Sequence, residues 1–520
     1  MYGKPNTKVN KPVPESPHVP TFKPKCKPKC EPASKPTCIS HCTPNKTFVY
    51  KTCRHLFRKE KRRFIILLAI FVFCVVLLII MIILISIYDH AENFGIVIDA
   101  GSGGTRAYLY KWYDENTNTN DEVSEIGNCV TDKLQILYFQ NRNEDLMKCI
   151  KSLLLKLRAV KFKPPIYLAA TAGMRILEIE NKTLTKVMFN EIKSLFYVLG
   201  WNFKFVGILK GYYEGISGWT TVNYLKNTIG KNSTVRKDRF STFGVLDLGG
   251  SSTQIAFETK TGDPVILFTR KYLLYSRSYL CYGVNMFRIR YLTTTLLDAT
   301  SSEVNCFLKG TPTTMPEDSY TCRSENSRGI DLSTFKKFYR PNAADCRNQI
   351  AKAIGKNVDV IQVDKKMRFV AVAVFAYYNA FLTKYYRMTG KYNSFVQATG
   401  LFCTEDYATL DAKYGKDAKF AQNYCLVGNF IIVLFQMYGI NASNFDNVIF
   451  ANKIRGQNTG WNLGYMIKQT KDIPNSRAFK LNVVIFVVTV IVCLLYITIA
   501  ICIFLFKMWE RKQKIHNIRV

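Results

Sequence analysis

Two near-copies of one short segment decide the fold: Asp99-Ala100-Gly101-Ser102-Gly103-Gly104-Thr105 and Asp247-Leu248-Gly249-Gly250-Ser251-Ser252-Thr253. Aligned on their aspartates, both copies have a glycine at +2 and a threonine at +6. An apolar run precedes each copy, at 94–98 and 243–246, and strand-like residues follow at 107–112 and 254–258. Each copy therefore predicts a β-hairpin whose glycine tip exposes backbone N–H groups to an anion.

A single Gly-rich turn is more often a plain turn than a phosphate site. The second copy changes this, because it lies 148 positions further along the chain with the same Asp, Gly and Thr offsets. Such self-similarity is typical of a duplicated lobe. We therefore expect an α/β protein with two related lobes and a phosphate-binding cleft between them.

Two segments, 64–87 and 483–506, each consist of 24 uncharged, mostly apolar residues. As helices they would be about 36 Å long, enough to cross a hydrocarbon core of about 30 Å. The first begins too far into the chain, and is too long, for a signal peptide. Basic residues precede it at 58–63 and follow the second segment at 507–514. The positive-inside rule thus predicts two transmembrane helices with both termini in the cytoplasm.

Residues 88–482 are then expected on the far side of the membrane. They are long enough for two lobes and hold eight of the 16 cysteines, an even number that fits disulfides in an oxidising compartment. Asn181, Asn232 and Asn441 begin glycosylation sequons there, although a single sequon is a frequent chance match. The net charge of +34 favours anionic ligands but fits a soluble charged surface equally well.

The first 63 residues contain Lys-Pro repeats and are expected to form a disordered cytoplasmic tail. Its lysines are expected to lie along anionic lipid headgroups. Four cysteines in this tail, with His41, could bind zinc or carry palmitate. Their spacing fits no standard zinc pattern, so plain reduced thiols are the simpler interpretation. These cysteines are Cys26, Cys30, Cys38 and Cys42.

Histidine is scarce. The five histidines stand at 18, 41, 55, 90 and 516, so only His90 would lie outside the membrane, close to its surface. Ser-His-Asp and Cys-His mechanisms, His-ligated zinc hydrolysis and phosphohistidine chemistry all require an imidazole in the site. What remains is a carboxylate base combined with hard, oxygen-bound cations.

Asp99 and Asp247 end their predicted strands beside the two turns. A carboxylate there can hold the water shell of Mg²⁺ or Ca²⁺ while the ion bridges phosphate oxygens. Either aspartate by itself could instead cap its turn, but the pair favours the metal. Because an aspartate that holds a metal is a poor proton acceptor, the base must lie elsewhere.

Glu214 is the best candidate for that base. It stands in a predicted helix, 211–225, with three glycines, each of which costs about 1 kcal/mol relative to Ala and so indicates close approach of a ligand or another element. Taken by itself, a helical Glu is usually a solvated surface residue. A further segment, 167–175, predicts a buried strand and a small-residue turn. Thr171 could offer a hydroxyl there, and a turn without a ligand is an equally good interpretation.

In order along the chain, these segments resemble the first four apyrase conserved regions of the ecto-nucleoside triphosphate diphosphohydrolases. The matching segments are 99–102, 170–175, Glu214-Gly215 with Gly218-Trp219, and 247–254. Residues 275–283 look like the fifth region, and 460–466 resemble the segment before the last span. The resemblance covers essentially all of 88–482, and the two predicted spans are similar to those of the cell-surface branch.

The resemblance implies two actin-like, ribonuclease-H-type lobes with a nucleotide bound between them. It also implies removal of the γ- and then the β-phosphate in the presence of Ca²⁺ or Mg²⁺. Glu214 would be the general base, with Ser252 and Gln254 placing the attacking water. Asp99 and Asp247 would organise the water shell of the metal. The phosphate contacts would come from Ser102, Gly103, Gly104, Thr105, Thr171, Gly249 and Gly250.

Relatives hold the nucleobase in an aromatic pocket. Tyr378 and Tyr438 look like its stacking pair, although a Tyr in an apolar stretch is more often plain core. Relatives also imply four disulfides, a choice that sequence by itself cannot make because eight cysteines allow 105 pairings. The implied pairs are Cys129 with Cys149, Cys281 with Cys322, Cys306 with Cys346, and Cys403 with Cys425.

The chain departs from the family in two regions. Relatives usually have Asp-Ala-Gly-Ser-Ser-His-Thr-Ser in the first, whereas Gly103, Gly104 and Arg106 replace the second Ser, the His and the last Ser here. In the fifth region Arg277 replaces a usual His. One imidazole fewer and two guanidinium groups more are expected to change how tri- and diphosphates are held. We hypothesise that Arg106 or Arg277 compensates for the missing imidazole.

The sequence thus predicts a plasma-membrane ectoenzyme that hydrolyses extracellular nucleoside tri- and diphosphates, such as ATP and ADP, to monophosphates. Lobe I is expected at about 88–210 and 455–480, lobe II at about 211–454, and a second cytoplasmic tail at 507–520. No nucleic-acid partner is expected. Relatives imply a homo-oligomer formed through the spans, although neither span has a strong small-residue packing motif.

Two alternatives stay open at this point. One is a non-catalytic nucleotide-binding surface protein that keeps the two-lobed cleft. The other is a lumenal Golgi or endoplasmic-reticulum diphosphatase that acts on GDP or UDP.

Overall fold

The chain divides into two units, which are described separately: Leu84–Asn482, and Met1–Ile83 with Val483–Val520. The structure is a computed structural model. It describes residues 62, 65–66, 68–76, 79–80, 92–113, 123–157, 163–230, 241–268, 270–297, 303–311, 320–324, 327, 338–339, 341–470 and 477–517. Apart from residue 62, the predicted N-terminal tail lies outside these residues, and so do its four cysteines.

Leu84–Asn482 contains two five-stranded sheets with the same topology. The first has the order β3-β2-β1-β4-β5 and the second β12-β11-β6-β7-β8, which is the same order read from the other end. In each sheet the first three strands along the chain pair with one another in antiparallel order. The fourth and fifth strands run parallel to the first strand. The predicted pair of related α/β lobes is therefore confirmed.

The strands of the first sheet are β1 (Glu92–Gly101), β2 (Gly104–Tyr113), β3 (Ser124–Thr131), β4 (Ile166–Ala170) and β5 (Phe203–Ile208). Those of the second are β6 (Phe243–Leu248), β7 (Ser252–Leu267), β8 (Arg270–Leu280), β11 (Arg368–Ala373) and β12 (Val448–Phe450). The short pairs are β9 (Glu303–Val304) with β10 (Phe338–Tyr339), and β13 (Lys453–Ile454) with β14 (Gln457–Asn458).

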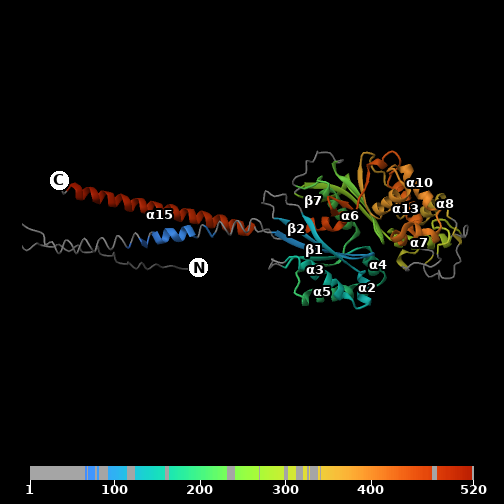
Figure 1. Ribbon diagram of the computed structural model, residues 1–520, viewed down its shortest axis with the longest axis horizontal. Coiled ribbons are helices and arrows are strands. Elements are labelled where there is room, and N and C mark those ends of the chain that lie inside the picture. The colour runs from blue at the N-terminus through green and yellow to red at the C-terminus, as the bar shows by residue number, and fades with distance from the viewer. Residues whose placement is uncertain are drawn as a thin grey trace, which may run out of the picture. The chain divides into compact units, whose positions relative to one another are not determined.

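Helices fill the connections between the strands (Figure 1). Against the outer face of the first sheet these are α2 (Leu134–Phe139), α3 (Asn143–Leu154), α4 (Ala172–Glu180) and α5 (Lys182–Val198). Against that of the second they are α7 (Val284–Leu297), α8 (Ala343–Ile354), α9 (Val374–Tyr386), α10 (Tyr392–Phe402), α11 (Leu410–Tyr414), α12 (Ala418–Ala421) and α13 (Tyr424–Met437). Two further helices, α6 (Gly211–Leu225) and α14 (Trp461–Thr470), lie between the sheets.

Successive side chains of a strand point to opposite faces of its sheet, and those of the two sheets pack into three apolar cores. Ile98 of β1 faces an outer core shared with α2 to α5. Val97 of β1 and Val245 of β6 face a middle core together with Trp219 of α6. Leu246 of β6 faces the opposite outer core, which α7 to α13 complete. The unit is thus built in five layers, in which two helices separate two sheets and further helices cover the outer faces.

The two middle helices cross from one lobe to the other. α6 follows β5 of the first sheet but packs on β6, β7 and β8 of the second, whereas α14 follows β12 and packs on β1 and β2. Where α6 and α14 meet, a Cβ on Gly464 would lie 2.0 Å from the Ser217 carbonyl oxygen. Gly464 also donates its N–H to Thr221 Oγ1 at 2.8 Å. Only glycine allows this approach, which joins the lobes backbone to backbone.

The predicted disulfides all occur: Cys129–Cys149, Cys281–Cys322, Cys306–Cys346 and Cys403–Cys425. Of the predicted glycosylation sites, Asn181 and Asn441 are exposed, and Asn232 lies outside the described residues. Asn181 also caps α5, because its side chain accepts the Leu184 N–H. Whether any of the three carries a glycan stays a prediction.

In the second unit, the described part of the chain has one helix long and apolar enough to cross a membrane, Val490–Gln513. It belongs to α15 (Arg477–Asn517), which contains the predicted span 483–506. Of the other predicted span, residues 65–66, 68–76 and 79–80 are described and helical. The bent pair Tyr407–Ala421 and Tyr424–Met437 passes the same test, but α13 is buried within the core of its lobe. Membrane insertion of the two spans stays a prediction.

Candidate active site

The two glycine turns face each other. A Cβ on Gly250, in the turn between β6 and β7, would lie 2.7 Å from Ser102 Oγ in the turn between β1 and β2. The start of α4 is equally close, because a Cβ on Gly173 would lie 3.4 Å from Ser102 Cα. Thr171, just before α4, donates its N–H to the Ala100 carbonyl at 3.2 Å. Three predicted motifs therefore meet at one place between the lobes.

The turn between β6 and β7 is fixed by the start of α7. The Gly249 carbonyl accepts the Val284 N–H at 3.0 Å, and the Gly250 carbonyl accepts the Asn285 N–H at 2.9 Å. Since the C=O and N–H of one trans peptide point in opposite directions, the Gly250 N–H points away from α7. Gly283 packs against this turn, where a Cβ would lie 2.3 Å from Ser251 N. This turn is therefore rigid before any ligand binds.

Asp99 and Asp247 occupy equivalent positions in the two lobes. Each stands two residues after a valine of the middle core, Val97 or Val245, so each carboxylate continues the inner face of its sheet. Asp99 is paired across β2 with Arg106, and Asp247 is paired across β7 with Gln254. The structure thus brings the two predicted metal aspartates to the same end of the middle core.

Both aspartates are held in surroundings that disfavour their charge. Burial, followed by repulsion from Glu214, raises the pKa of Asp99 to about 8, although Arg106 opposes the rise. The same two causes raise the pKa of Asp247 to about 7. Asp99 Oδ1 is buried and has no hydrogen-bond partner among the residues that the structure describes. A buried carboxylate oxygen without a donor is a place where a cation or its water shell can bind.

Glu214 lies in the first turn of α6 and is paired with Arg175 of α4. Arg175 Nη2 lies 2.5 Å from Glu214 Oε2, and the two side chains are 13 and 9% exposed, so water screens the pair little. Burial raises the pKa of Glu214, and the charge and hydrogen bond of Arg175 oppose this rise. The charge of Glu214 in turn contributes to the raised pKa values of Asp99 and Asp247.

Ser252 and Gln254 of β7 complete a hydrogen-bonded network around this ion pair. Gln254 Nε2 donates to Ser252 Oγ at 2.6 Å and to Ser278 Oγ of β8 at 2.9 Å. Arg175 reaches the same hydroxyls, with Nη2 donating to Ser252 Oγ and Nη1 to Ser278 Oγ, both at 3.3 Å. The three predicted catalytic residues therefore lie together, with Arg175 in contact with two of them.

The glycines of α6 are explained by neighbouring side chains. A Cβ on Gly211 would lie 2.2 Å from Arg175 Nη1, and one on Gly215 would lie 2.4 Å from Ser276 Oγ. Because Gly211 and Gly215 have no side chains, α6 can pack directly on β8. The Arg175 guanidinium can then lie against the first turn of α6. The prediction that another element closely approaches these glycines is confirmed.

The two unusual arginines lie in different places. A Cβ on Gly101 would lie 3.5 Å from Asp99 Oδ1 and 3.8 Å from Arg106 Nη1, so the Arg106 guanidinium lies over the first turn. Arg277 is exposed, 3.5 Å from Asp359 and over the Tyr275 ring. Its neighbours Ser276 and Ser278 point to the site, so alternation along β8 directs Arg277 to the other face.

The remaining predicted phosphate contacts differ in exposure. Ser102, Gly249 and Gly250 are half-buried and Gly103 is exposed. Gly104 has φ of +140°, a conformation that needs glycine. Thr105 is fully buried, and its hydroxyl has no partner within the described part of the chain.

Tyr378 and Tyr438, the predicted nucleobase pair, are both fully buried. Tyr378 donates to Thr399 at 3.1 Å and packs edge-on against Phe395 and Tyr424. Neither ring has a free face in this structure. Tyr377, the neighbouring residue on α9, is 62% exposed.

Sequence reasoning missed Arg175 and Ser278 as site residues. Arg175 ends the quoted segment 167–175, and its position at the end of a small-residue turn after a strand was the available signal. Ser276 and Ser278 alternate around Arg277, a period of two that marks one face of a strand. Neither pattern says which residue across the cleft it meets.

Two sheets of one topology, with an aspartate beside each of two opposed glycine turns, form a two-lobed arrangement that can hold a phosphate chain and a cation. A family model for the GDA1/CD39 (nucleoside phosphatase) family matches residues 86–483. The chain belongs to this family.

Relatives match most of this region. Ectonucleoside triphosphate diphosphohydrolase 3 of Mus musculus is 30% identical over 425 residues, which cover 74% of this chain and 79% of the relative. Ectonucleoside triphosphate diphosphohydrolase 1 of Bos taurus is 29% identical, with coverage of 74 and 82%. Among solved structures, a nucleoside triphosphate hydrolase from Neospora caninum has a TM-score of 0.53 at 13% identity, covering 73% of this chain and 92% of that one. This last likeness concerns the fold.

Proposed function

We propose that this chain is a membrane-anchored ectonucleotidase that hydrolyses nucleoside tri- and diphosphates to monophosphates by direct attack of water. The observation that carries the proposal is the buried Glu214–Arg175 pair, which is hydrogen-bonded to Ser252 directly after one of the two opposed glycine turns. The names of the relatives support tri- and diphosphates as substrates.

Ser252 Oγ and Gln254 would hold the attacking water beside Glu214. Because Glu214 Oε2 is engaged by Arg175, we assign proton acceptance to Oε1. As the water oxygen bonds to the terminal phosphorus, its proton passes to Glu214 and the bond to the bridging oxygen breaks, releasing inorganic phosphate. The backbone N–H of Gly250 and the turn of residues 101–104 would bind the phosphate oxygens.

The residues present fit a divalent cation. Asp99 and Asp247 are close carboxylates with raised pKa values, and Asp99 Oδ1 lacks a donor among the described residues. Among the described residues, no group of three His, Cys, Asp or Glu side chains could bind a metal ion directly. We therefore propose that the two aspartates hold the ion through water. Bound Ca²⁺ or Mg²⁺ would neutralise charge on the phosphate chain.

For the nucleobase, Tyr378 and Tyr438 would have to be uncovered, whereas Tyr377 already offers an exposed ring. A ring stacks on a base only with a free face. We expect Tyr377→Ala to raise KM for nucleotides with little change in KM for inorganic tripolyphosphate. Tyr378→Phe, which keeps the buried ring, is the matched control. Equal effects of Tyr377→Ala on both substrates would exclude stacking at this position.

The test of the function is phosphate release by intact cells that express the full chain, with ATP, ADP, UTP, UDP and GDP, with and without chelator. We expect cation-dependent release from tri- and diphosphates by sealed cells. Release only after permeabilisation, with GDP and UDP preferred, would indicate the lumenal alternative. Nucleotide binding without release would indicate a non-catalytic surface protein.

A further inference from the structure

Exposed apolar side chains concentrate at one end of the first lobe. Among described residues 92–470, four large apolar side chains are more than 70% exposed: Leu155 at 74%, Tyr197 at 79%, Val198 at 81% and Val360 at 71%. Leu155 directly follows α3, and Tyr197 and Val198 end α5. Single exposed apolar residues are ordinary, but three at two neighbouring helix ends form a patch.

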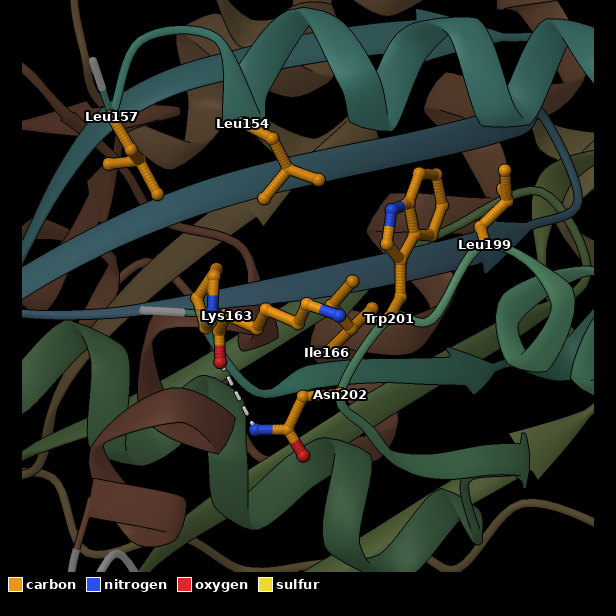
Figure 2. Close-up of a pocket in the computed structure, with 8 residues that line it drawn as sticks. Leu154, Leu157, Lys163, Ile166, Leu199, Trp201 and Asn202 are labelled. Carbon is orange, nitrogen blue, oxygen red and sulfur yellow. Dashed lines mark hydrogen bonds between the residues drawn. The ribbon is translucent and has the colours of Figure 1, made fainter. Parts of the chain in front are cut away.

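An apolar pocket of about 250 Å³ lies at the same helix ends, lined by sequence neighbours of these residues (Figure 2). Leu154, Leu157, Leu199 and Trp201 line it, with Lys163 at its rim. Two of its lining residues are joined by a hydrogen bond, from Asn202 Nδ2 to the Lys163 carbonyl at 3.2 Å. We call this pocket together with Leu155, Tyr197 and Val198 the basal patch.

The basal patch lies at the edge of the sheet opposite the candidate active site. β1, β4 and β5 are parallel, and the pocket residues directly precede β4 and β5. Asp99 and the glycine turn stand at the other end of β1. The amino ends of these strands therefore share one edge with the pocket, and their carboxyl ends share the edge with the site.

Only a short stretch of chain separates that edge from the predicted membrane span. Glu92, the first residue of β1, comes five residues after Ile87, the end of span 64–87. Five residues extend at most about 18 Å. Ile96, four residues further along, donates its N–H to the carbonyl of Pro165, a residue next to the pocket wall, at 2.9 Å.

Charge and residue type in the two chain segments that line the pocket suit a bilayer surface. No Asp or Glu occurs between Asp145 and Glu178 or between Glu191 and Glu214, whereas Lys156, Lys163 and Lys204 are all exposed there. Tyr197 and Trp201 are the residue types that gather at headgroup level, and lysine pairs with lipid phosphate.

We propose that the basal patch rests on the outer surface of the lipid bilayer, with Tyr197 and Val198 at the boundary between headgroups and acyl chains. The active site then opens away from the membrane, toward solvent that carries nucleotides. This inference rests on the membrane anchoring in the proposed function, but not on the catalytic roles.

The test places a photo-crosslinking benzoylphenylalanine at Tyr197 in the full chain, reconstituted in phosphatidylcholine nanodiscs with and without phosphatidylserine. The matched control places benzoylphenylalanine at Phe139 instead. Phe139 is 64% exposed at the end of α2, on the edge of the lobe opposite the basal patch. Mass spectrometry of the irradiated protein measures lipid adducts. We expect at least about tenfold more adduct at position 197 than at position 139, in both lipid compositions.

Equal adduct at the two positions, or crosslinking of position 197 to a second copy of the chain, would overturn the proposal. The same samples report on the proposed function separately. A chain that does not co-elute with the nanodiscs is not anchored, whereas one that co-elutes and releases phosphate but gives no lipid adduct at 197 overturns the basal contact only.

Discussion

The two lobes use one topology but place different chemistry on it. Asp99 and Asp247 end equivalent strands, yet the residue paired with Asp99 is Arg106 and the residue paired with Asp247 is Gln254. The fourth residue of the helix after the fourth strand is Arg175 in α4 and Tyr377 in α9. The first lobe thus supplies guanidinium groups, and the second supplies amide, hydroxyl and aromatic groups.

This difference shows how a duplicated fold acquires an asymmetric site. A nucleotide carries its nucleobase at one end, and water attacks the phosphate chain at the other end. The two ends therefore need unlike partners in the protein. The equivalent strand ends keep the aspartates, while the neighbouring positions diverge. Five predictions test how far the equivalence of the lobes extends.

The largest effect is expected for Glu214→Gln, which removes the carboxylate that acts on both aspartates. We expect kcat to fall by about 10²–10⁴-fold, because a general base contributes about that much. Nucleotide affinity, measured by calorimetry, should be retained. Glu178→Gln, an exposed residue of α4, is the control. Turnover within tenfold of the unmodified enzyme would remove Glu214 from the role of base.

The second prediction concerns the aspartates themselves. Asp99→Asn and Asp247→Asn should each weaken activation by Ca²⁺ or Mg²⁺ by about 10–100-fold, the usual cost of losing a group that orients metal-bound water. Titration of activity with cation measures this. Similar losses would extend the equivalence of the lobes to the metal. A loss at one aspartate only would restrict the metal to that lobe.

Arg175→Met should lower kcat/KM by about 10–100-fold, since a charge-assisted bond is worth about 1.5–3 kcal/mol. Arg175 opposes the rise in the pKa of Glu214. Its removal should therefore raise that pKa and move the acid limb of the pH–rate profile to higher pH, because Glu214 must be ionised to accept a proton. Arg175→Lys should restore part of the shift. An unmoved acid limb would show that Arg175 acts only on structure.

The fourth prediction asks which arginine, Arg106 or Arg277, compensates for the missing imidazole. Arg106 lies over the first turn, whereas Arg277 is on the far face of β8. We expect Arg106→Ala to lower kcat/KM for triphosphates by about tenfold, the value of one charge-assisted contact. Arg277→Ala should stay within about twofold. The opposite ranking of the two variants would mean that the first turn does not hold the terminal phosphate.

The smallest effect concerns stability without metal. The pKa of Asp99 is about 8 in the folded chain, above the ordinary 3.8, so the folded state binds this proton more tightly than the unfolded state does. The resulting destabilisation is absent below pH 3.8 and grows as pH rises toward 8. Chelator-treated protein should therefore have a lower Tm at pH 8 than at pH 5, by about 1 °C for each kcal/mol lost in a unit of this size.

Added Mg²⁺ should raise the Tm more at pH 8 than at pH 5, because it favours the ionised carboxylates. Asp99→Asn should remove much of the difference between the two pH values. A chelated protein whose Tm rises from pH 5 to pH 8, in both forms, would show that the Asp99 environment does not disfavour its charge.

Much of the fold was predictable because local patterns determine it. The apolar runs and glycine tips gave the hairpins β1–β2 and β6–β7, and their repetition gave the two lobes. The cysteine pairs followed from the family resemblance and not from spacing. The meeting of Arg175 with Glu214 was not predictable, because it joins α4 to α6 across 39 residues through packing of the lobes.

The nucleobase residues show another limit. Tyr377 and Tyr378 are adjacent in an apolar helix. Successive residues of a helix are rotated by about 100° around its axis, which is enough to leave one ring exposed and the other buried. Composition does not reveal which side of α9 meets the core. The burial of Tyr378 comes instead from Gly428 of α13, where a Cβ would lie 2.1 Å from the Tyr378 hydroxyl.

The crossing of α6 and α14 at Gly464 has a mechanical consequence. Because the backbones touch there, with a Cβ site only 2.0 Å from Ser217, the lobes cannot slide along this line without a collision. A rotation of one lobe against the other about this crossing would keep the two backbones in contact. Ser217 stands one helical turn after Glu214, so such a swing would leave the base almost stationary while the distant ends of both lobes travel furthest.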